Sequence, residues 1–190
     1  MTGSTLNMHY TIADPKTFGI SEYEPVLPIY HSGQPEDSKE HCSDLLHRLD
    51  RIDPDRLSPE NAYTYRLLHR SLENDLALAD FPYYNEPLSP SSGMQSQLPV
   101  LLAEYTFRTK RDVTDYLALL DQIDDYFSSL LLYEQEKAAA GFFMPACSSE
   151  KVRKQCDTIV TTEELAQGTH FLQTTFEDRL SELQKQGLFT

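Results

Sequence analysis

Apolar side chains recur every three or four residues over most of the chain, which is the period of an amphipathic α-helix. The clearest stripe predicts a helix over about Glu36–Ile52, which ends before Pro54 because the residue ahead of a proline is pushed out of the helical region. Ser58 stands where an N-cap residue is favoured and predicts a second helix over about Pro59–Ala79.

The longest stripe follows Thr109 and Asp112, which resemble a capping box, and predicts a helix over about Lys110–Ala140. A kink near Asp121–Asp125 is left open. A continuous helix of that length spans about 46 Å, whereas a compact chain of this size has a diameter of roughly 42 Å. The pattern therefore predicts an elongated fold, or a helix that packs against something outside this chain.

A short helix is predicted over about Ser96–Tyr105, with Pro99 tolerated in its first turn. Ser148 stands as an N-cap for a helix over about Ser149–Thr161, and a short helical turn follows over Thr162–Gln167. A capping-box pair at Thr174 and Glu177 predicts a last helix that reaches Gln186.

Residues 1–36 lack this helical period and are rich in proline, so they predict an extended arm, with room for one short strand pair around Val26–Tyr30. Residues 37–190 form the helical body. We expect an all-α fold: a single domain, an elongated bundle of about five to six helices with one long helix and an extended, Pro-rich N-terminal arm.

The net charge of the chain limits the classes of partner that it is expected to bind. With 30 acidic and 16 basic residues the formal net charge is −14, and such a surface repels phosphate backbones and anionic lipid, so neither nucleic acid nor a membrane surface is expected. No run approaches the roughly 20 apolar residues of a membrane span. The first residues lack the basic and apolar segments of a signal peptide, so the localisation stays open.

Candidate chemistry along the chain is weak. His41, Asp44 and His47 have tempting spacing, but on one helix the two imidazoles point about 240° apart and cannot share an ion. The acids at Asp121–Asp125 lie opposite the apolar stripe and indicate a solvated face. Cys147 stands near a predicted helix start, where a thiol can be activated, but without an identifiable partner histidine a structural thiol is favoured. We expect no catalytic residue and no metal ligand in this chain.

A long segment from Pro82 to Pro99 is rich in proline, serine, tyrosine and glutamine, and connections of that length are uncommon without a purpose. Its polar and aromatic side chains could line a substrate cleft, and the candidates are Tyr83, Tyr84, Gln95 and Gln97. The alternative is a loop packed over the helices by its own aromatic rings.

The same segment, with two others, is similar in sequence to a known protein family. The string PLSPSSGMQSQLPVLLAEYTFRTKRDVTDYLALL, together with HYTIADPKTFGI from His9 to Ile20 and YEQEKAAAGFFMP from Tyr133 to Pro145, resembles the N-terminal part of a large bacterial family. That family is catalogued as a domain of unknown function, number eight hundred eighty-five, and its members are regarded as zinc metallopeptidases.

The resemblance implies a helical enzyme whose metal motif, a His-Glu-Gly-x-Pro-Gly-His variant, lies downstream of this sequence in a much longer chain. None of the metal ligands, nor the catalytic glutamate, can be carried onto a residue here. The first hypothesis is therefore an N-terminal, non-catalytic lobe of a zinc-dependent peptidase. It would shape the cleft for a peptide substrate, and its partner would be the C-terminal catalytic part of the same polypeptide, which holds the zinc.

A second hypothesis is a free-standing helical binding or scaffold module without chemistry. It expects the natural gene to end near Thr190, so the reading frame beyond that residue separates the two. A stand-alone enzyme that uses Cys147 is a third and remote possibility.

Overall fold

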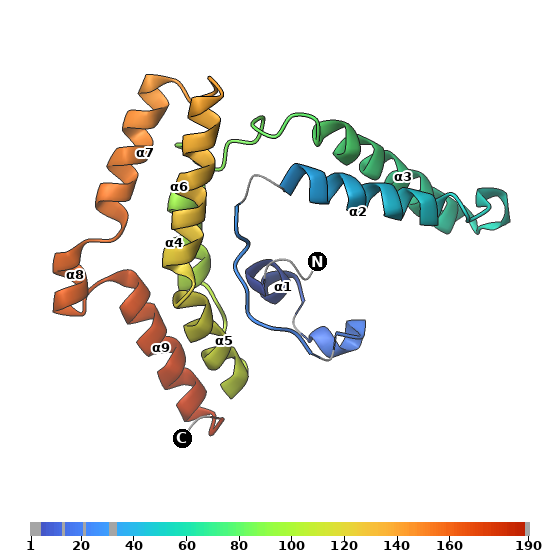
Figure 1. Cartoon of the computed structure of the whole chain (residues 1–190). Helices are drawn as coiled ribbons and strands as arrows, with labels where there is room; N and C mark the ends of the chain where they lie inside the picture. Colours follow the sequence, from blue (N-terminus) through green and yellow to red (C-terminus); the bar gives the residue numbers. More distant parts are fainter. Residues whose placement is uncertain (1–4, 13, 21, 31–33, 189–190) are drawn as a thin grey trace. The chain divides into compact units, whose positions relative to one another are not determined.

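The computed structural model describes residues 5–12, 14–20, 22–30 and 34–188. Within these ranges the chain forms helices and no strand, so the all-α prediction is confirmed (Figure 1). The elements in chain order are α1 (Thr5–Thr11), the 3₁₀ turn η1 (Pro15–Phe18), α2 (Gln34–Leu49), the 3₁₀ turn η2 (Pro54–Arg56), α3 (Pro59–Leu78), α4 (Met94–Ala103), α5 (Lys110–Leu120), α6 (Ile123–Ala139), α7 (Ala146–Ile159), α8 (Thr162–Gln167) and α9 (Phe171–Lys185).

The chain divides into two compact units. Unit 1 contains Met1–Ile29, Glu86–Leu131 and Phe143–Thr190, and unit 2 contains Tyr30–Asn85 and Leu132–Phe142. The prediction of a single domain over residues 1–190 stays a prediction. Among the described helices none has the length and the hydropathy that crossing a bilayer requires.

Unit 1 has a densely packed core between α4, α5, the first half of α6 and α9. The most deeply buried large side chains of the described residues all belong to it: Leu98, Leu102, Tyr105, Tyr116, Leu119, Tyr126, Leu130, His170 and Leu183. Arg179 of α9 donates to the carbonyl oxygens of Leu102 and Tyr105, which stand at the C-terminal end of α4. Because the last carbonyls of a helix lack partners within it, this guanidinium ties α9 to α4.

Unit 2 is built around an antiparallel pair of helices, α2 and α3, which lie side by side in Figure 1. The half-buried residues of α3 and its C-cap follow a three-four spacing that forms one seam: Ala62, Tyr65, His69, Leu72, Leu76 and Ala79. Ser58 caps α3 by accepting from the Asn61 amide at 3.3 Å, as predicted. No residue of α3 is fully buried, so the pair is held by a single narrow seam.

The prediction of one long helix over Lys110–Ala140 is wrong. The stripe is divided between α5 and α6 by a turn at Asp121–Gln122, inside the segment where a kink was left open. The Gln122 amide group donates to the Pro25 carbonyl at 2.8 Å, and its Oε1 accepts from the Leu27 amide at 3.0 Å. The break therefore coincides with an anchor for the N-terminal segment, which local sequence does not reveal. Helix α6, with 17 residues, spans only about 26 Å rather than about 46 Å.

The prediction of an arm extended throughout residues 1–36 is also wrong, because α1 occupies Thr5–Thr11. The buried residues Leu6, Met8, His9 and Ile12 have the i, i+3 and i, i+4 spacings of one helix face, but the stripe is too short to stand out among the prolines that follow. The expected strand pair around Val26–Tyr30 is absent, since these residues, all described, have no regular structure. The start of α2 at Gln34 likewise precedes the predicted boundary.

The start of a helix was predicted correctly where the expected capping residue caps it in the structure. It was misplaced where another residue forms the cap. The Thr109–Asp112 capping box is present at the start of α5. By contrast α9 begins at Phe171, because the buried His170 ring caps it through Nδ1, and the expected capping residue Thr174 lies inside the helix. Helix α7 begins before Ser148, since the Pro145 carbonyl accepts from the amides of its first turn. Helix α4 begins at Met94, two residues before Ser96.

Candidate functional site

The loop after α3 ends the first segment of unit 2, and its backbone is held by the second half of α6, which belongs to the same unit. The Tyr133 hydroxyl donates to the carbonyl oxygens of Pro82 at 2.9 Å and Asn85 at 3.2 Å. The buried Lys137 ammonium donates to the Asn85 carbonyl at 3.1 Å. These bonds fix the course of Phe81–Asn85, because the single hydroxyl hydrogen of Tyr133 is shared between two loop carbonyls and the Lys137 ammonium donates a second hydrogen to one of them.

Two of the predicted cleft residues lie on this anchored loop. The Tyr83 ring is half-buried and packs 6.0 Å from the Tyr133 ring and 6.1 Å from the Phe142 ring, centroid to centroid. The Tyr84 side chain is 81% exposed. Tyr83 is thus part of an aromatic cluster, whereas Tyr84 is presented to solvent.

The other two predicted residues lie in unit 1, on α4. Gln95 is only 3% exposed. Its Nε2 donates to the Ser89 carbonyl at 2.7 Å and to Gln155 Oε1 at 2.9 Å, and Gln155 donates in turn to the Pro90 carbonyl at 2.9 Å. Gln97 is exposed. Gln95 therefore ties the Ser89–Gly93 turn to α7, and the cleft role of all four residues stays a prediction.

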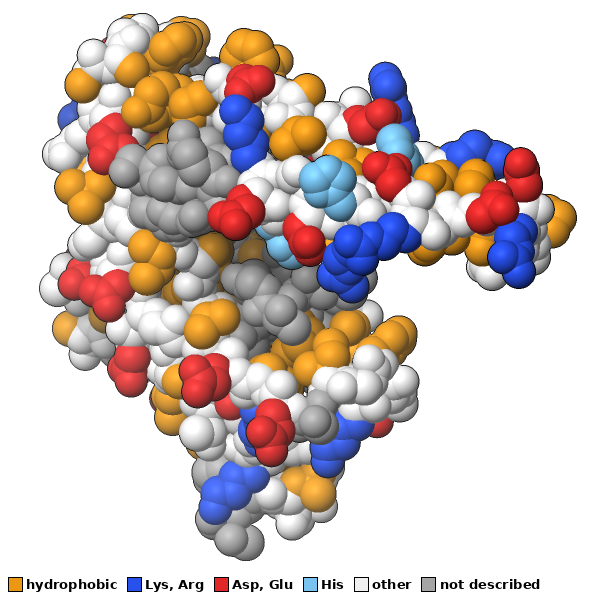
Figure 2. All heavy atoms as spheres, turned by 45° about the vertical axis from the view of Figure 1, so that its right-hand side comes forward, with side chains coloured by type: hydrophobic (Ala, Val, Ile, Leu, Met, Phe, Trp, Pro, Cys, Tyr) orange, Lys and Arg blue, Asp and Glu red, His pale blue; other side chains and the backbone are white. Residues whose placement is uncertain are grey.

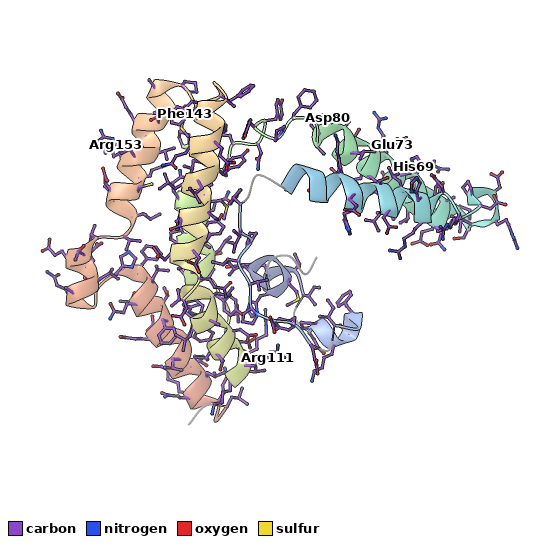
Figure 3. The ribbon with its side chains drawn as sticks, in the orientation of Figure 1. His69, Glu73, Asp80, Arg111, Phe143 and Arg153 are labelled. Atoms are coloured by element: carbon purple, nitrogen blue, oxygen red, sulfur yellow. The ribbon has the colours of Figure 1, made fainter. Side chains whose placement is uncertain are left out.

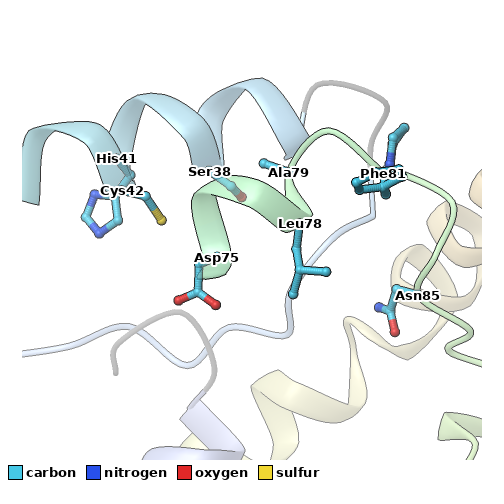
Figure 4. A pocket seen from close by; sticks show the side chains of 9 residues that line it. Ser38, His41, Cys42, Asp75, Leu78, Ala79, Phe81 and Asn85 are labelled. Atoms are coloured by element: carbon cyan, nitrogen blue, oxygen red, sulfur yellow. The ribbon is translucent and has the colours of Figure 1, made fainter. Parts of the chain in front are cut away.

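A pocket of about 420 Å³ opens in unit 2 beside this loop (Figure 4). Its lining comes from α2, from the end of α3 and from the loop: Ser38, His41, Cys42, Asp75, Leu78, Ala79, Phe81, Pro82 and Asn85. The size falls within the range of small-ligand pockets, roughly 300–1,000 Å³. The packing of α2 on α3 and the anchored backbone of the loop together create the pocket.

The electrostatics of this pocket are set by Asp75. Burial raises the pKa of the adjacent Cys42 thiol, and the negative charge of Asp75 raises it further. Cys42 therefore stays protonated as a buried wall of the pocket rather than a nucleophile. The arrangement offers one carboxylate, a histidine, an amide and a hydroxyl beside apolar walls, which suits recognition of a polar group joined to an apolar stem.

A second polar cluster lies in unit 1, where α1 meets α5. The His9 ring stacks on Tyr105 with 3.7 Å between centroids, and its Nε2 lies 2.8 Å from the Thr106 carbonyl. Its Nδ1 lies 3.8 Å from Asp112, the third residue of α5 and the acid of its capping box. Burial lowers the pKa of His9, and the Asp112 carboxylate opposes that effect. Because Asp112 is engaged by the backbone amides of Arg108 and Thr109, the cluster fastens α1 rather than forming an open site.

The described residues do not fit a zinc ion. They contain no group of three His, Cys, Asp or Glu side chains placed to hold a metal. Where a histidine does meet two acids, at His69 on α3 (Figure 3), its Nε2 lies 3.2 Å from Asp50 and its Nδ1 3.5 Å from Glu73, so both ring nitrogens already face carboxylates. No step of a metal-dependent reaction is therefore derived from this chain.

Sequence reasoning missed the pocket itself. His41 was weighed only with Asp44 and His47 on its own helix, whereas the structure brings it to Asp75 and Asn85 across a helix pair and a loop. The available signal was an acid, Asp75, next to the seam residue Leu76 in the last turn of the predicted helix. Cys147, the remaining candidate, is exposed in the first turn of α7.

Comparison with curated proteins found no match, and comparison with solved structures found none either. The sequence model of one family does match, over residues 16–188, and its description is bacterial protein of unknown function (DUF885). That match covers nearly the whole chain, including both units and the loop that joins α3 to α4. The chain therefore belongs to the bacterial family DUF885.

Proposed function

We propose that this chain is a non-catalytic helical lobe of a zinc-dependent peptidase and that it contributes binding surface for a peptide substrate. Family membership and the resemblance of three long strings support the proposal. In this division of labour the C-terminal part of the same polypeptide holds the zinc ion and the catalytic glutamate. A zinc ion bound there would supply an activated water for attack on the peptide carbonyl.

The pocket of unit 2 is the observation that carries the binding role. Its loop wall is fixed by Tyr133 and Lys137, so a ligand would meet a largely pre-formed surface and little chain would have to be ordered. At the same time Phe81 and Tyr84 remain exposed on that loop. Exposed aromatic rings on a fixed backbone are suited to contact with a peptide.

Within the proposal the four predicted cleft residues have two kinds of role. Tyr84, exposed on the loop of unit 2, would touch the substrate. Gln97 is exposed on unit 1, and its contact with substrate is a separate part of the proposal. Tyr83 and Gln95 would act indirectly: Tyr83 supports the loop from the aromatic cluster, and Gln95 holds the Ser89 turn.

The test compares this chain with the longer natural polypeptide. Both are assayed for zinc content after dialysis and for hydrolysis of a fluorogenic peptide set. The longer polypeptide should retain zinc and cleave peptides, whereas this chain should bind peptide without retaining zinc or turning substrate over. Zinc-dependent cleavage by this chain alone, or none by the longer one, would refute the proposal.

One feature favours the second candidate, a helical binding module without chemistry. Helix α3 exposes large apolar side chains at positions outside its seam with α2: Tyr63, Leu67, Leu68 and Leu78. Exposed apolar rows of this kind mark protein-binding surfaces. A reading frame that ends near Thr190, with no peptidase activity in the natural protein, would establish this candidate over the first.

A further inference from the structure

The pocket of unit 2 contains one carboxylate, that of Asp75, which forms no ion pair with any residue in the described part of the chain. Other acids on or next to the same helices have partners: Asp44 pairs with Arg48, Asp80 pairs with Lys39, and Asp50 lies beside the His69 ring. Asp75 also projects from the helix pair on the same side as Leu78 in the close view (Figure 4). Its charge is therefore available to a ligand in the pocket.

Apolar groups flank that carboxylate. Leu78 is 54% exposed and the Phe81 ring is 62% exposed, and Ala79 and Pro82 complete the wall. A carboxylate beside an apolar wall matches a ligand in which a methylene stem ends in a cation, since such stems pack on apolar surface while their charged ends seek an acid. An aromatic face can in addition attract a guanidinium or ammonium group.

The pocket is larger than a single stem, at about 420 Å³. Three further polar side chains line it, those of Ser38, His41 and Asn85, and within the described residues none of these side chains forms a hydrogen bond. These side chains can form hydrogen bonds with the backbone amide groups of a bound peptide residue. A simple amine has no such groups, so the lining favours a peptide as the ligand. The charges facing the pocket are Asp75 and, when protonated, His41.

We infer that this pocket binds a lysine or arginine side chain of a peptide, with the methylene stem against Leu78 and Phe81 and the cation at Asp75. The inference rests on the proposed function, because it names the side chain that the same surface selects. Lys39 of α2 is paired with Asp80 rather than with Asp75.

The probes are Nα-acetyl-arginine amide and Nα-acetyl-lysine amide, with Nα-acetyl-norleucine amide as the uncharged match. Each is titrated at pH 8 into the ¹⁵N-labelled chain, and amide shifts are followed along α2, the end of α3 and the loop. Both basic probes should bind about tenfold more tightly than norleucine amide, because a charged hydrogen bond is lost with the cation. The shifts should be centred on residues 38–42 and 75–85.

Two substitutions isolate the carboxylate. Asp75→Asn should reduce the affinity for the basic probes to that for norleucine amide, and Asp75→Glu should preserve most of the preference. Asp44→Asn is the matched control, since it removes the same charge from α2 outside the pocket and should leave binding unchanged. Should Asp75→Asn fail to fold, the comparison of probes on the unaltered chain still decides.

Equal binding of the three probes, binding of none, or full affinity in Asp75→Asn would overturn the inference. Those results leave the proposed function standing, because zinc-dependent cleavage by the longer polypeptide is measured separately. Conversely, a basic-residue preference in a protein whose longer form cleaves no peptide would support the pocket and refute the peptidase.

Discussion

The two units bury their side chains to different depths. In unit 1, four helices enclose a core in which Leu102 and Leu119 are almost inaccessible. In unit 2, α3 has no fully buried residue and meets α2 along one seam of half-buried side chains. The pocket lies in the second unit, while the polar clusters of the first serve to fasten its parts. Local stability therefore differs within the chain, and ligand-binding elements are commonly drawn from the less stable part.

The largest expected effect comes from removing core volume in unit 1. Leu102→Ala should lower the free energy of unfolding by about 3 kcal/mol, because it deletes a fully buried side chain and leaves a cavity. Leu67→Ala, at a 53% exposed position of α3, should change it by less than about 0.5 kcal/mol. Urea titrations of both variants test the contrast, and equal losses would show that the units do not differ in packing.

Gly93 provides the next test, because the backbone passes close to it. A Cβ there would lie 2.2 Å from the Ser89 amide nitrogen and 2.6 Å from its carbonyl oxygen, distances that only a backbone shift can relieve. Gly93→Ala should cost about 2 kcal/mol. Gly141→Ala meets no neighbouring atom and should cost about 1 kcal/mol through its φ of +88° alone. Thermal unfolding measures both losses. A smaller loss of stability in Gly93→Ala than in Gly141→Ala would show that the backbone of Ser89 does not pass so close to Gly93.

A smaller effect is expected at the anchor of the loop. Tyr133→Phe keeps the ring and removes the hydroxyl that bonds Pro82 and Asn85, so it should cost about 1 kcal/mol. Hydrogen exchange should speed up at Tyr83–Asn85 and stay unchanged at α4. Unchanged exchange throughout would mean that the hydroxyl does not hold the loop.

The smallest effect is a pH dependence in unit 1. Burial lowers the pKa of His9 below its usual value near 6.5, so the unfolded chain takes up a proton at higher pH than the folded one. The contribution of His9 is therefore complete above the unfolded pKa and declines as the pH falls through it. In His9→Phe, which keeps a ring on Tyr105, stability should vary less between pH 7.5 and 5. An identical slope in both proteins would contradict this.

Sequence reasoning succeeded where the decisive contact is local. The Ser58 and Thr109 caps bond within three residues, and both were predicted. It failed where the partner is distant: the break before Ile123 coincides with the hydrogen bond from Gln122 to Pro25, 97 positions away. The same limit applies to the site. Tyr83 and Gln95 could be singled out by composition, but their partners Tyr133 and Gln155 come from other helices.

The pocket was beyond sequence reasoning for the same reason. Asp75 and His41 are 34 positions apart and line one pocket only because α2 and α3 pair along the seam. The pattern of surface charge does not indicate the position of the pocket either, because acidic and basic side chains are interspersed on the visible face of the α2–α3 pair (Figure 2).

The most direct test of the binding role is hydrogen exchange of the chain with and without a blocked pentapeptide that has a central lysine. Slower exchange is expected at residues 38–42 and 75–85, in the loosely packed unit, with little change in α4, α5 and α9. Protection confined to those unit 1 helices, or no protection at saturating peptide, would contradict the account.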